Sequence, residues 1–146
     1  MTRERKYPNT DTFFYYNANP KNRITGDCVA RAIVTASGQD YNALIMDMAL
    51  YQCITGYDAT YGTGRYLDQK GWTKHPQPRK SDGTKYTGKE FCEMLNRNNA
   101  DFGNIVANIG GNHMVCIKKV LGKYKVHDIW NSTGGCIGNW WTWDRG

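Results

Sequence analysis

The sequence lacks the features typical of membrane, secreted and metal-binding proteins. None of its apolar runs approaches the length of a membrane span, and no apolar segment of a signal peptide follows the charged start, residues 1–6. The five cysteines are an odd number and include no C-x-x-C pair. His113-x-x-Cys116 is one half of a metal site, but in a strand its two ends lie on opposite faces. We therefore expect a cytoplasmic protein with reduced thiols, no metal, no cofactor and no membrane partner.

Charge is unequal but dispersed. The chain has 19 Lys and Arg against 13 Asp and Glu, which gives a net charge of +6. An acidic partner protein would suit this charge. The longest basic cluster is only Lys118, Lys119 and Lys123, whereas a nucleic-acid surface needs a concentrated basic patch. We interpret the excess as a solvated basic surface and do not expect a nucleic-acid partner.

The length of 146 residues suits a single domain, residues 1–146, with one core. Capping residues and apolar periodicity predict helices at 27–36, from Asp40 to Gly56, and from Thr87 onward. Alternating apolar residues predict strands at 104–109, 113–120, 123–130 and near 139–143. An extended piece at 13–16 and long loops over 57–86, which include a short helical turn at Tyr66-Leu67 and a strand start at Gly71-Trp72, complete the chain. Helices followed by strands indicate an α+β fold, with N-terminal helices packed on a C-terminal antiparallel sheet.

Side-chain periodicity also predicts what each element buries. In the second helix the expected inward residues are Leu44, Ile45, Met48, Ala49 and Cys53. In the last strand, alternation predicts Trp141 and Trp143 in the core and Trp140 exposed. The Gly62-Thr63-Gly64-Arg65 segment lacks the full phosphate-loop pattern, so we interpret it as an ordinary turn.

A cysteine stands where a polar turn meets an apolar helix. Residues 22–27 contain a glycine and run directly into the first predicted helix, and either Thr25 or Asp27 can cap it. Cys28 then falls in the first turn, where the positive end of the helix favours a thiolate. The free N–H groups of that turn can hold an oxyanion. Cys28 is therefore a candidate nucleophile, although a free cysteine at a helix start is more often a small buried apolar residue.

A thiolate nucleophile needs a base and a group that orients the base. His113 starts a strand after Gly110-Gly111-Asn112, and Asp128 lies on the next strand. If Leu121-Gly122 forms a two-residue turn, paired residue numbers sum to 243, and His113 and Asp128 share one face as diagonal neighbours. A three-residue turn would place them on opposite faces. In the first register, His127 faces the other way, and we expect a surface role for it.

The Gly26-Asp27-Cys28 helix start, the later Asn112-His113 strand start and the following strand with Asp128 together resemble the papain-like cysteine peptidase superfamily. Bacteriocin-processing peptidases and transglutaminase-like proteins share this residue order, and the fifteen-residue separation of His113 and Asp128 is most similar to the latter. The resemblance implies a papain-like fold with Cys28 as nucleophile, His113 as base and acid, and Asp128 as orienter. It also implies Asn22, at the position of an oxyanion-donating Gln, and Asn131 as the alternative third member.

These observations predict thiol chemistry on a peptide or amide bond, isopeptide bonds included, with a peptide or protein as substrate. Hydrolysis and acyl transfer share the same steps, so the sequence does not separate them. The alternative is a non-catalytic, small basic binding or inhibitor protein on the same scaffold, with a host factor or a nucleic-acid enzyme as its partner. Short chains of this composition are frequent among phage proteins, and such an origin would place the protein in the host cytoplasm.

Overall fold

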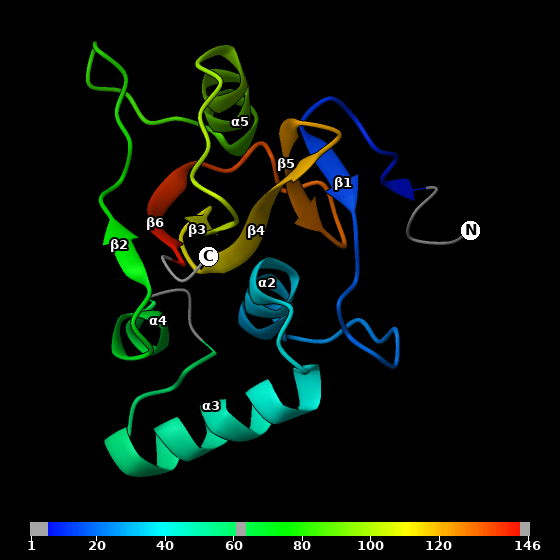
Figure 1. The fold of residues 1–146 in the computed structure, drawn as a ribbon, viewed down its shortest axis with the longest axis vertical. Helices are drawn as coiled ribbons and strands as arrows, with labels where there is room; N and C mark the ends of the chain where they lie inside the picture. Colours follow the sequence, from blue (N-terminus) through cyan, green and yellow to red (C-terminus); the bar gives the residue numbers. More distant parts are fainter. Residues whose placement is uncertain (1–5, 61–63, 144–146) are drawn as a thin grey trace.

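The computed structural model describes residues 6–60 and 64–143, which form an α+β structure around one mixed sheet (Figure 1). The strands are β1 (Phe13–Tyr15), β2 (Thr73–His75), β3 (Ile105–Ile109), β4 (His113–Val120), β5 (Lys123–Asp128) and β6 (Ile137–Thr142). The helices of the described part are α2 (Cys28–Ser37), α3 (Tyr41–Thr55), α4 (Arg65–Gln69) and α5 (Gly88–Arg97). The predicted α+β class is therefore confirmed.

The sheet has the strand order β1-β5-β4-β3-β6-β2, and both of its edges come from outside the C-terminal third. β1 adds to β5 in parallel, whereas β2 pairs with β6 in antiparallel orientation. The prediction of a purely antiparallel, C-terminal sheet is wrong in this respect. A three-residue edge strand has little apolar pattern of its own, and its direction depends on packing that lies far away in the sequence.

The β4–β5 hairpin has the register that the two-residue turn predicts. Its pairs run from Val120 opposite Lys123 to Cys116 opposite His127, so each pair sums to 243. Leu121 and Gly122 have φ values of 52° and 83°, which is the left-handed backbone of the tight turns that join twisted strands. The hairpin therefore brings the start of β4 and the end of β5 to the same end of the sheet.

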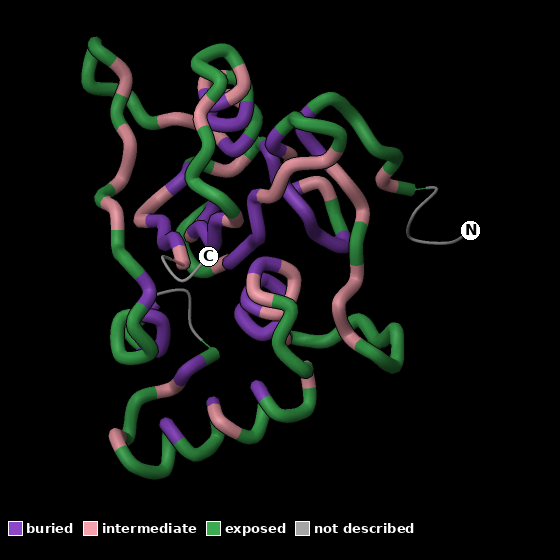
Figure 2. Tube along the Cα trace, in the orientation of Figure 1, coloured by how far each residue is buried: buried purple, intermediate pink, exposed green. Residues whose placement is uncertain are grey.

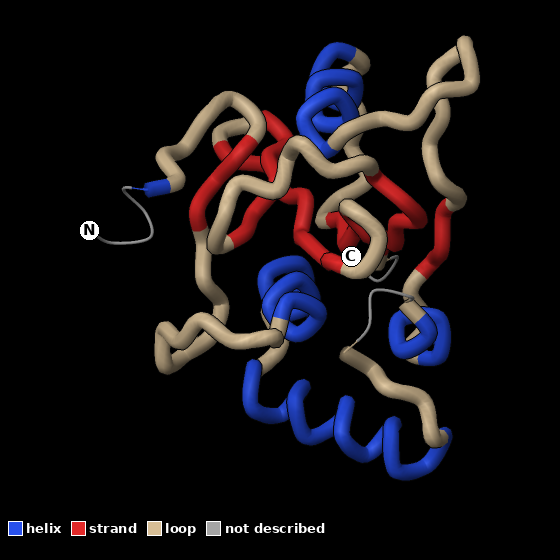
Figure 3. Tube along the Cα trace, turned by 180° about the vertical axis from the view of Figure 1, so that it is seen from behind, coloured by secondary structure: helices blue, strands red, loops and turns tan. Residues whose placement is uncertain are grey.

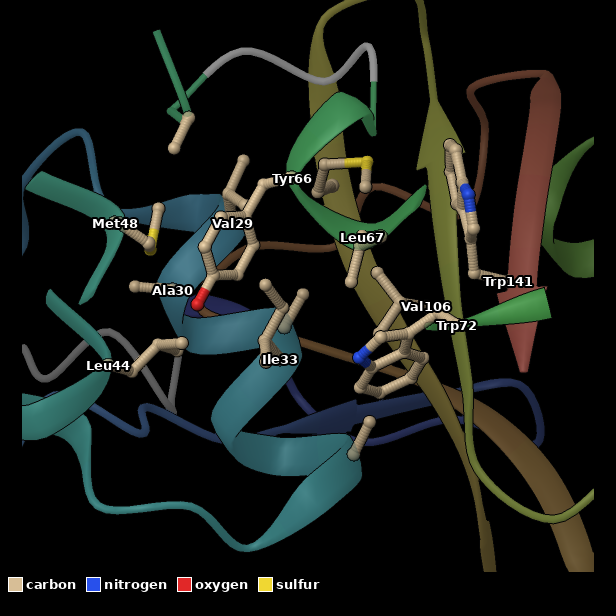
Figure 4. Packing of buried hydrophobic residues seen from close by; sticks show 14 of the residues in the cluster. Val29, Ala30, Ile33, Leu44, Met48, Tyr66, Leu67, Trp72, Val106 and Trp141 are labelled. Carbon is tan, nitrogen blue, oxygen red and sulfur yellow. The ribbon is translucent and has the colours of Figure 1, made fainter. Parts of the chain in front are cut away.

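Helices cover both faces of the sheet, as Figures 1 and 3 show. On one face α2 lies between the sheet and α3, with α4 beside them. Their side chains form one buried cluster (Figure 4), with residues such as Val29, Ile33, Leu44, Leu67 and Trp141. α2 is thus the central helix, packed between the sheet and α3.

Asp40 and Gly56 bound α3 as predicted, and the Asp40 carboxylate accepts a hydrogen bond from the Ala43 N–H. Leu44 and Met48 are buried, but Ile45, Ala49 and Cys53 are exposed, so the predicted inward face is only partly right. Figure 2 shows the outer turns of this helix as exposed. Apolar residues surround nearly the whole of α3, so periodicity could not identify the buried side.

The other face of the sheet lies under α5, whose N-terminus has the predicted capping box of Thr87 and Glu90. Phe91 and Leu95 pack there against a second buried cluster that includes Trp140. Trp140 is only 8% exposed, so the prediction of an exposed Trp140 is wrong. Alternation does place it opposite Trp141, but that opposite face is covered as well. Across the described ranges, no helix is both long and apolar enough to cross a bilayer.

Candidate active site

Cys28 is the first residue of α2 and is half-buried. Asp27 occupies the N-cap position of α2, as predicted. Its side chain makes no hydrogen bond to the first-turn N–H groups, so the predicted capping bond is absent. Its carboxylate instead accepts hydrogen bonds from Arg31 and Tyr41. The first-turn N–H groups, among them that of Cys28, are therefore left without this carboxylate as a partner.

His113 is the first residue of β4, and its ring lies between the sulfur of Cys28 and the carboxylate of Asp128. The Nε2 atom is 2.6 Å from Asp128 Oδ2, and the sulfur of Cys28 forms a hydrogen bond with the imidazole. Because Nε2 is engaged by the carboxylate, Nδ1 is the ring atom left for the sulfur. The indole of Trp130 packs against the same ring at 5.2 Å between centroids. The three residues predicted as a triad are thus brought together.

The ionisation of the pair follows from these contacts. Burial raises the pKa of the Cys28 thiol, but the hydrogen bonds from His113 and the Met114 N–H, with the charges of His113 and Arg31, lower it below its usual value. Burial lowers the pKa of His113, but the hydrogen bonds with Asp128 and Cys28 outweigh this and raise it to about 9. Both shifts favour the thiolate–imidazolium form of the pair.

Asp128 is only 2% exposed and accepts four hydrogen bonds. Oδ2 accepts from His113 and, at 2.8 Å, from the Ser132 hydroxyl, while Oδ1 accepts from Arg31 at 3.1 Å and the Ile129 N–H at 2.8 Å. A buried carboxylate with this many donors is held in one orientation.

The two asparagines proposed from the resemblance lie elsewhere in the hydrogen-bond network. Asn131, the alternative third member, accepts hydrogen bonds from the N–H and the hydroxyl of Thr133, which close a local turn. Asn22 lies on the exposed segment before α2 with a φ of 52°, and its side-chain oxygen Oδ1 accepts a hydrogen bond from the side-chain amide of Asn17. The role of Asn22 as an oxyanion donor stays a prediction.

A cavity of about 390 Å³ opens beside His113, with Trp130, Ser132, Gly110 and Gly135 among its lining residues. It places open, largely apolar space next to the imidazole. A larger cavity of about 730 Å³ lies at the far end of the hairpin, near Leu121 and Lys123, and contains none of the three site residues. The larger cavity is therefore separate from the three candidate residues, and the smaller one has His113, but neither Cys28 nor Asp128, in its lining.

Sequence reasoning missed Arg31 and Ser132, which both donate to Asp128. For Arg31 a signal exists, because an arginine four residues after Asp27 on one helix predicts an ion pair between the two side chains. For Ser132 we find no such signal, because its position depends on the loop that follows β5.

The other histidines do not join this site. His127 is 8% exposed, packs against Phe14 and donates from Nδ1 to the Lys125 carbonyl, so the expected surface role is wrong. β1, whose position the sequence did not reveal, covers it. His75 stacks on Trp140. Within residues 6–60 and 64–143, no three His, Cys, Asp or Glu side chains are grouped so that they could hold a metal ion.

Comparisons of the chain with protein-family models, curated proteins and solved structures gave no match.

Proposed function

We propose that the protein is a cysteine-dependent hydrolase or acyl transferase that acts on an amide bond of a peptide or protein, on a papain-like scaffold. The observation that carries the proposal is the hydrogen-bonded series of Cys28, His113 and Asp128, with a lowered pKa at the sulfur and a raised one at the imidazole. A nucleophile, a base and an orienting group in this order are the parts that covalent catalysis requires.

The scaffold part of the proposal is supported by how the elements supply these residues. The central helix α2 presents the sulfur at its N-terminus, and β4 and β5 of the sheet beneath it supply the imidazole and the carboxylate. This is the arrangement that the resemblance to papain-like peptidases implies.

The chemistry balances in two steps. The Cys28 thiolate attacks the carbonyl carbon, and the oxyanion lies at the start of α2, where the Cys28 N–H can donate to it. His113, as imidazolium, protonates the departing amine while the C–N bond breaks and a thioester forms. Water, or an amine in acyl transfer, then loses a proton to His113 and attacks the thioester, which releases the thiolate.

Alkylation with iodoacetamide near pH 6 tests the nucleophile. Cys28 is expected to react well ahead of the exposed Cys53 and Cys136, which are the informative comparison because Cys92 and Cys116 are buried. The lead should disappear in a His113→Ala variant and persist in a His75→Ala control. Equal rates at Cys28, Cys53 and Cys136 in the unmodified chain would contradict the proposal.

Acylation by p-nitrophenyl acetate tests the covalent step. We expect a burst of nitrophenolate that is lost in Cys28→Ser, with the acetyl group found on Cys28 by mass spectrometry. Added glycine ethyl ester distinguishes the two reactions, because only an acyl transferase would convert it to the acetylated amine in competition with water.

A second candidate, a binding protein on the same scaffold, is favoured by one observation on α3. Met46, Leu50 and Ile54 are 73%, 55% and 74% exposed at successive turns of that helix. Such an apolar row is typical of an interaction surface. This candidate predicts equal cysteine alkylation and no burst.

A further inference from the structure

Arg31 lies one turn after Cys28 on α2, and its position is unusual for a charged residue. It is only 6% exposed, although it is three residues after Cys28 and not on the apolar stripe of Val29 and Ile33. A guanidinium cannot lose its proton, so its burial is tolerated only where acceptors surround it. The acceptors around the guanidinium therefore indicate the role of its charge.

Two carboxylates accept hydrogen bonds from the guanidinium. The Nε atom donates to Asp27 Oδ1 at 2.8 Å, and one terminal nitrogen donates to Asp128 Oδ1 at 3.1 Å. The second oxygen of Asp27 accepts from the hydroxyl of Tyr41 at 2.6 Å and from Asn19 at 3.1 Å. The second oxygen of Asp128 meets His113. Arg31 thus joins the start of α2 to the carboxylate that orients the imidazole.

We propose that Arg31 is a positioning residue of this site, which holds Asp128 in the orientation that meets His113 and supplies the positive charge that keeps Cys28 ionised. The inference rests on the function proposed above. In this role Arg31 does not contact the substrate. It acts by orienting Asp128 and through the electrostatic effect of its charge on Cys28.

A lost helix cap supports a role beyond structure. Asp27 stands at the cap position, where a carboxylate that bonds the first-turn N–H groups is ordinarily stabilising. Here it makes no such bond and turns to Arg31 and Tyr41 instead. The absence of a stabilising cap bond at a capping residue is typical of functional sites. The N–H groups next to Cys28 therefore do not bind the Asp27 carboxylate.

The charges that face Arg31 explain its effect on the sulfur. They are Asp27 and Cys28 on its own helix, Asp128 on β5, His113 on β4 and, through Asp27, the Tyr41 hydroxyl on α3. With Cys28 as thiolate and His113 as imidazolium, the cluster contains three negative groups (Asp27, Asp128 and Cys28) and two positive ones (Arg31 and His113). Without the guanidinium only one positive group would remain, and the more negative potential would disfavour the thiolate.

Alkylation of Cys28 by iodoacetamide as a function of pH, in the full chain, tests the proposal. Arg31→Met keeps an unbranched, flexible side chain and removes the charge, so the acid limb of the profile should move up by about one pH unit, with alkylation at pH 6 about tenfold slower. Arg31→Lys keeps the positive charge but lacks the planar guanidinium that binds two carboxylates. The acid limb should therefore stay nearer its original pH, while acylation by p-nitrophenyl acetate slows. Arg65→Met, at an exposed arginine on α4, is the matched control and should leave the profile unchanged.

Asp27→Asn decides the outcome if Arg31→Met does not fold, as measured by cooperative urea unfolding. This variant keeps the size of the side chain and removes one negative charge beside Arg31, so the acid limb should move to lower pH, opposite to Arg31→Met. The inference is overturned if the acid limb of the alkylation profile does not move in folded Arg31→Met. It is also overturned if that limb stays in place or moves to higher pH in Asp27→Asn. In that case a Cys28 lead in the unmodified chain keeps the proposed function, whereas the absence of that lead ends both.

Discussion

The Nε2 atom of His113 lies 2.6 Å from Oδ2 of Asp128, a contact between residues fifteen positions apart that join the start of β4 to the end of β5. The carboxylate is almost completely buried and the imidazole is largely buried. In such surroundings a charge-assisted hydrogen bond is strong, and it fixes which ring nitrogen carries the proton.

Asp128→Asn should therefore impair catalysis more than it impairs the fold. The amide cannot supply the charge that stabilises the imidazolium, so we expect p-nitrophenyl acetate acylation to fall by about 10²-fold or more, with a lower pKa at His113. The variant also removes an ion pair from the buried Arg31, so the free energy of unfolding should fall by up to about 3 kcal/mol.

Ser132→Ala is the matched control for this change. Its hydroxyl donates to the same Oδ2 atom but carries no charge, so the loss of acylation should be far smaller. Urea unfolding of both variants separates inactivity from unfolding. Equal acylation by Asp128→Asn and the unmodified chain would mean that the carboxylate has no part in the reaction.

Titration of His113 provides a second prediction. Its pKa of about 9 depends on hydrogen bonds to both Asp128 and Cys28, so Cys28→Ala should lower it, as followed by NMR of the imidazole resonances. The folded value exceeds the unfolded value near 6.5, so protonated His113 stabilises the fold below pH 6.5. That stabilisation is lost as the pH rises through about 9. A pKa in Cys28→Ala that equals the original one would show that no sulfur–imidazole pair exists.

Local chemistry explains what the sequence could predict. The two-residue turn at Leu121-Gly122, the cap at Asp40 and the capping box at Thr87 each depend on residues within four positions of one another. The hairpin register followed from the turn, and with it the shared side of His113 and Asp128.

Contacts between distant segments explain what it could not. Arg31 and Asp128 are 97 positions apart, and the parallel addition of β1 to β5 has no local signal. Alternation assigned Trp140 and His127 to opposite faces but could not show that α5 covers Trp140 or that Phe14 of β1 packs against His127. Ideal alternation would also place His113 with Val115 under α5, whereas its ring interacts with Cys28 of α2.

His127 makes the fold sensitive to acid. Burial lowers its pKa to about 4, and the nearby charges of Lys118 and Lys125 act in the same direction. The unfolded chain takes up this proton near pH 6.5 and the folded chain only near 4, so the free energy of unfolding should fall as the pH drops between these values. The expected loss from this residue alone is about 3 kcal/mol.

His127→Phe removes the proton and keeps a ring against Phe14. Between pH 7 and pH 4 the free energy of unfolding, from urea denaturation, should therefore decrease by less in this variant than in the unmodified chain. The carboxylates contribute equally to both curves and cancel in the comparison. Parallel curves would show that His127 titrates normally in the folded state.

The turn of the site hairpin contains a residue that the backbone disfavours. Leu121 is fully exposed and has a φ of 52°, a conformation that asparagine adopts more readily than leucine. Leu121→Asn should raise the free energy of unfolding by about 1 kcal/mol, and Gly122→Ala, at a φ of 83°, should lower it by about as much. Because the turn sets the pairing that brings Asp128 to His113, the stabilised variant should keep the alkylation rate of Cys28 unchanged. A loss of stability in Leu121→Asn would contradict the left-handed turn and, with it, the register on which the site depends.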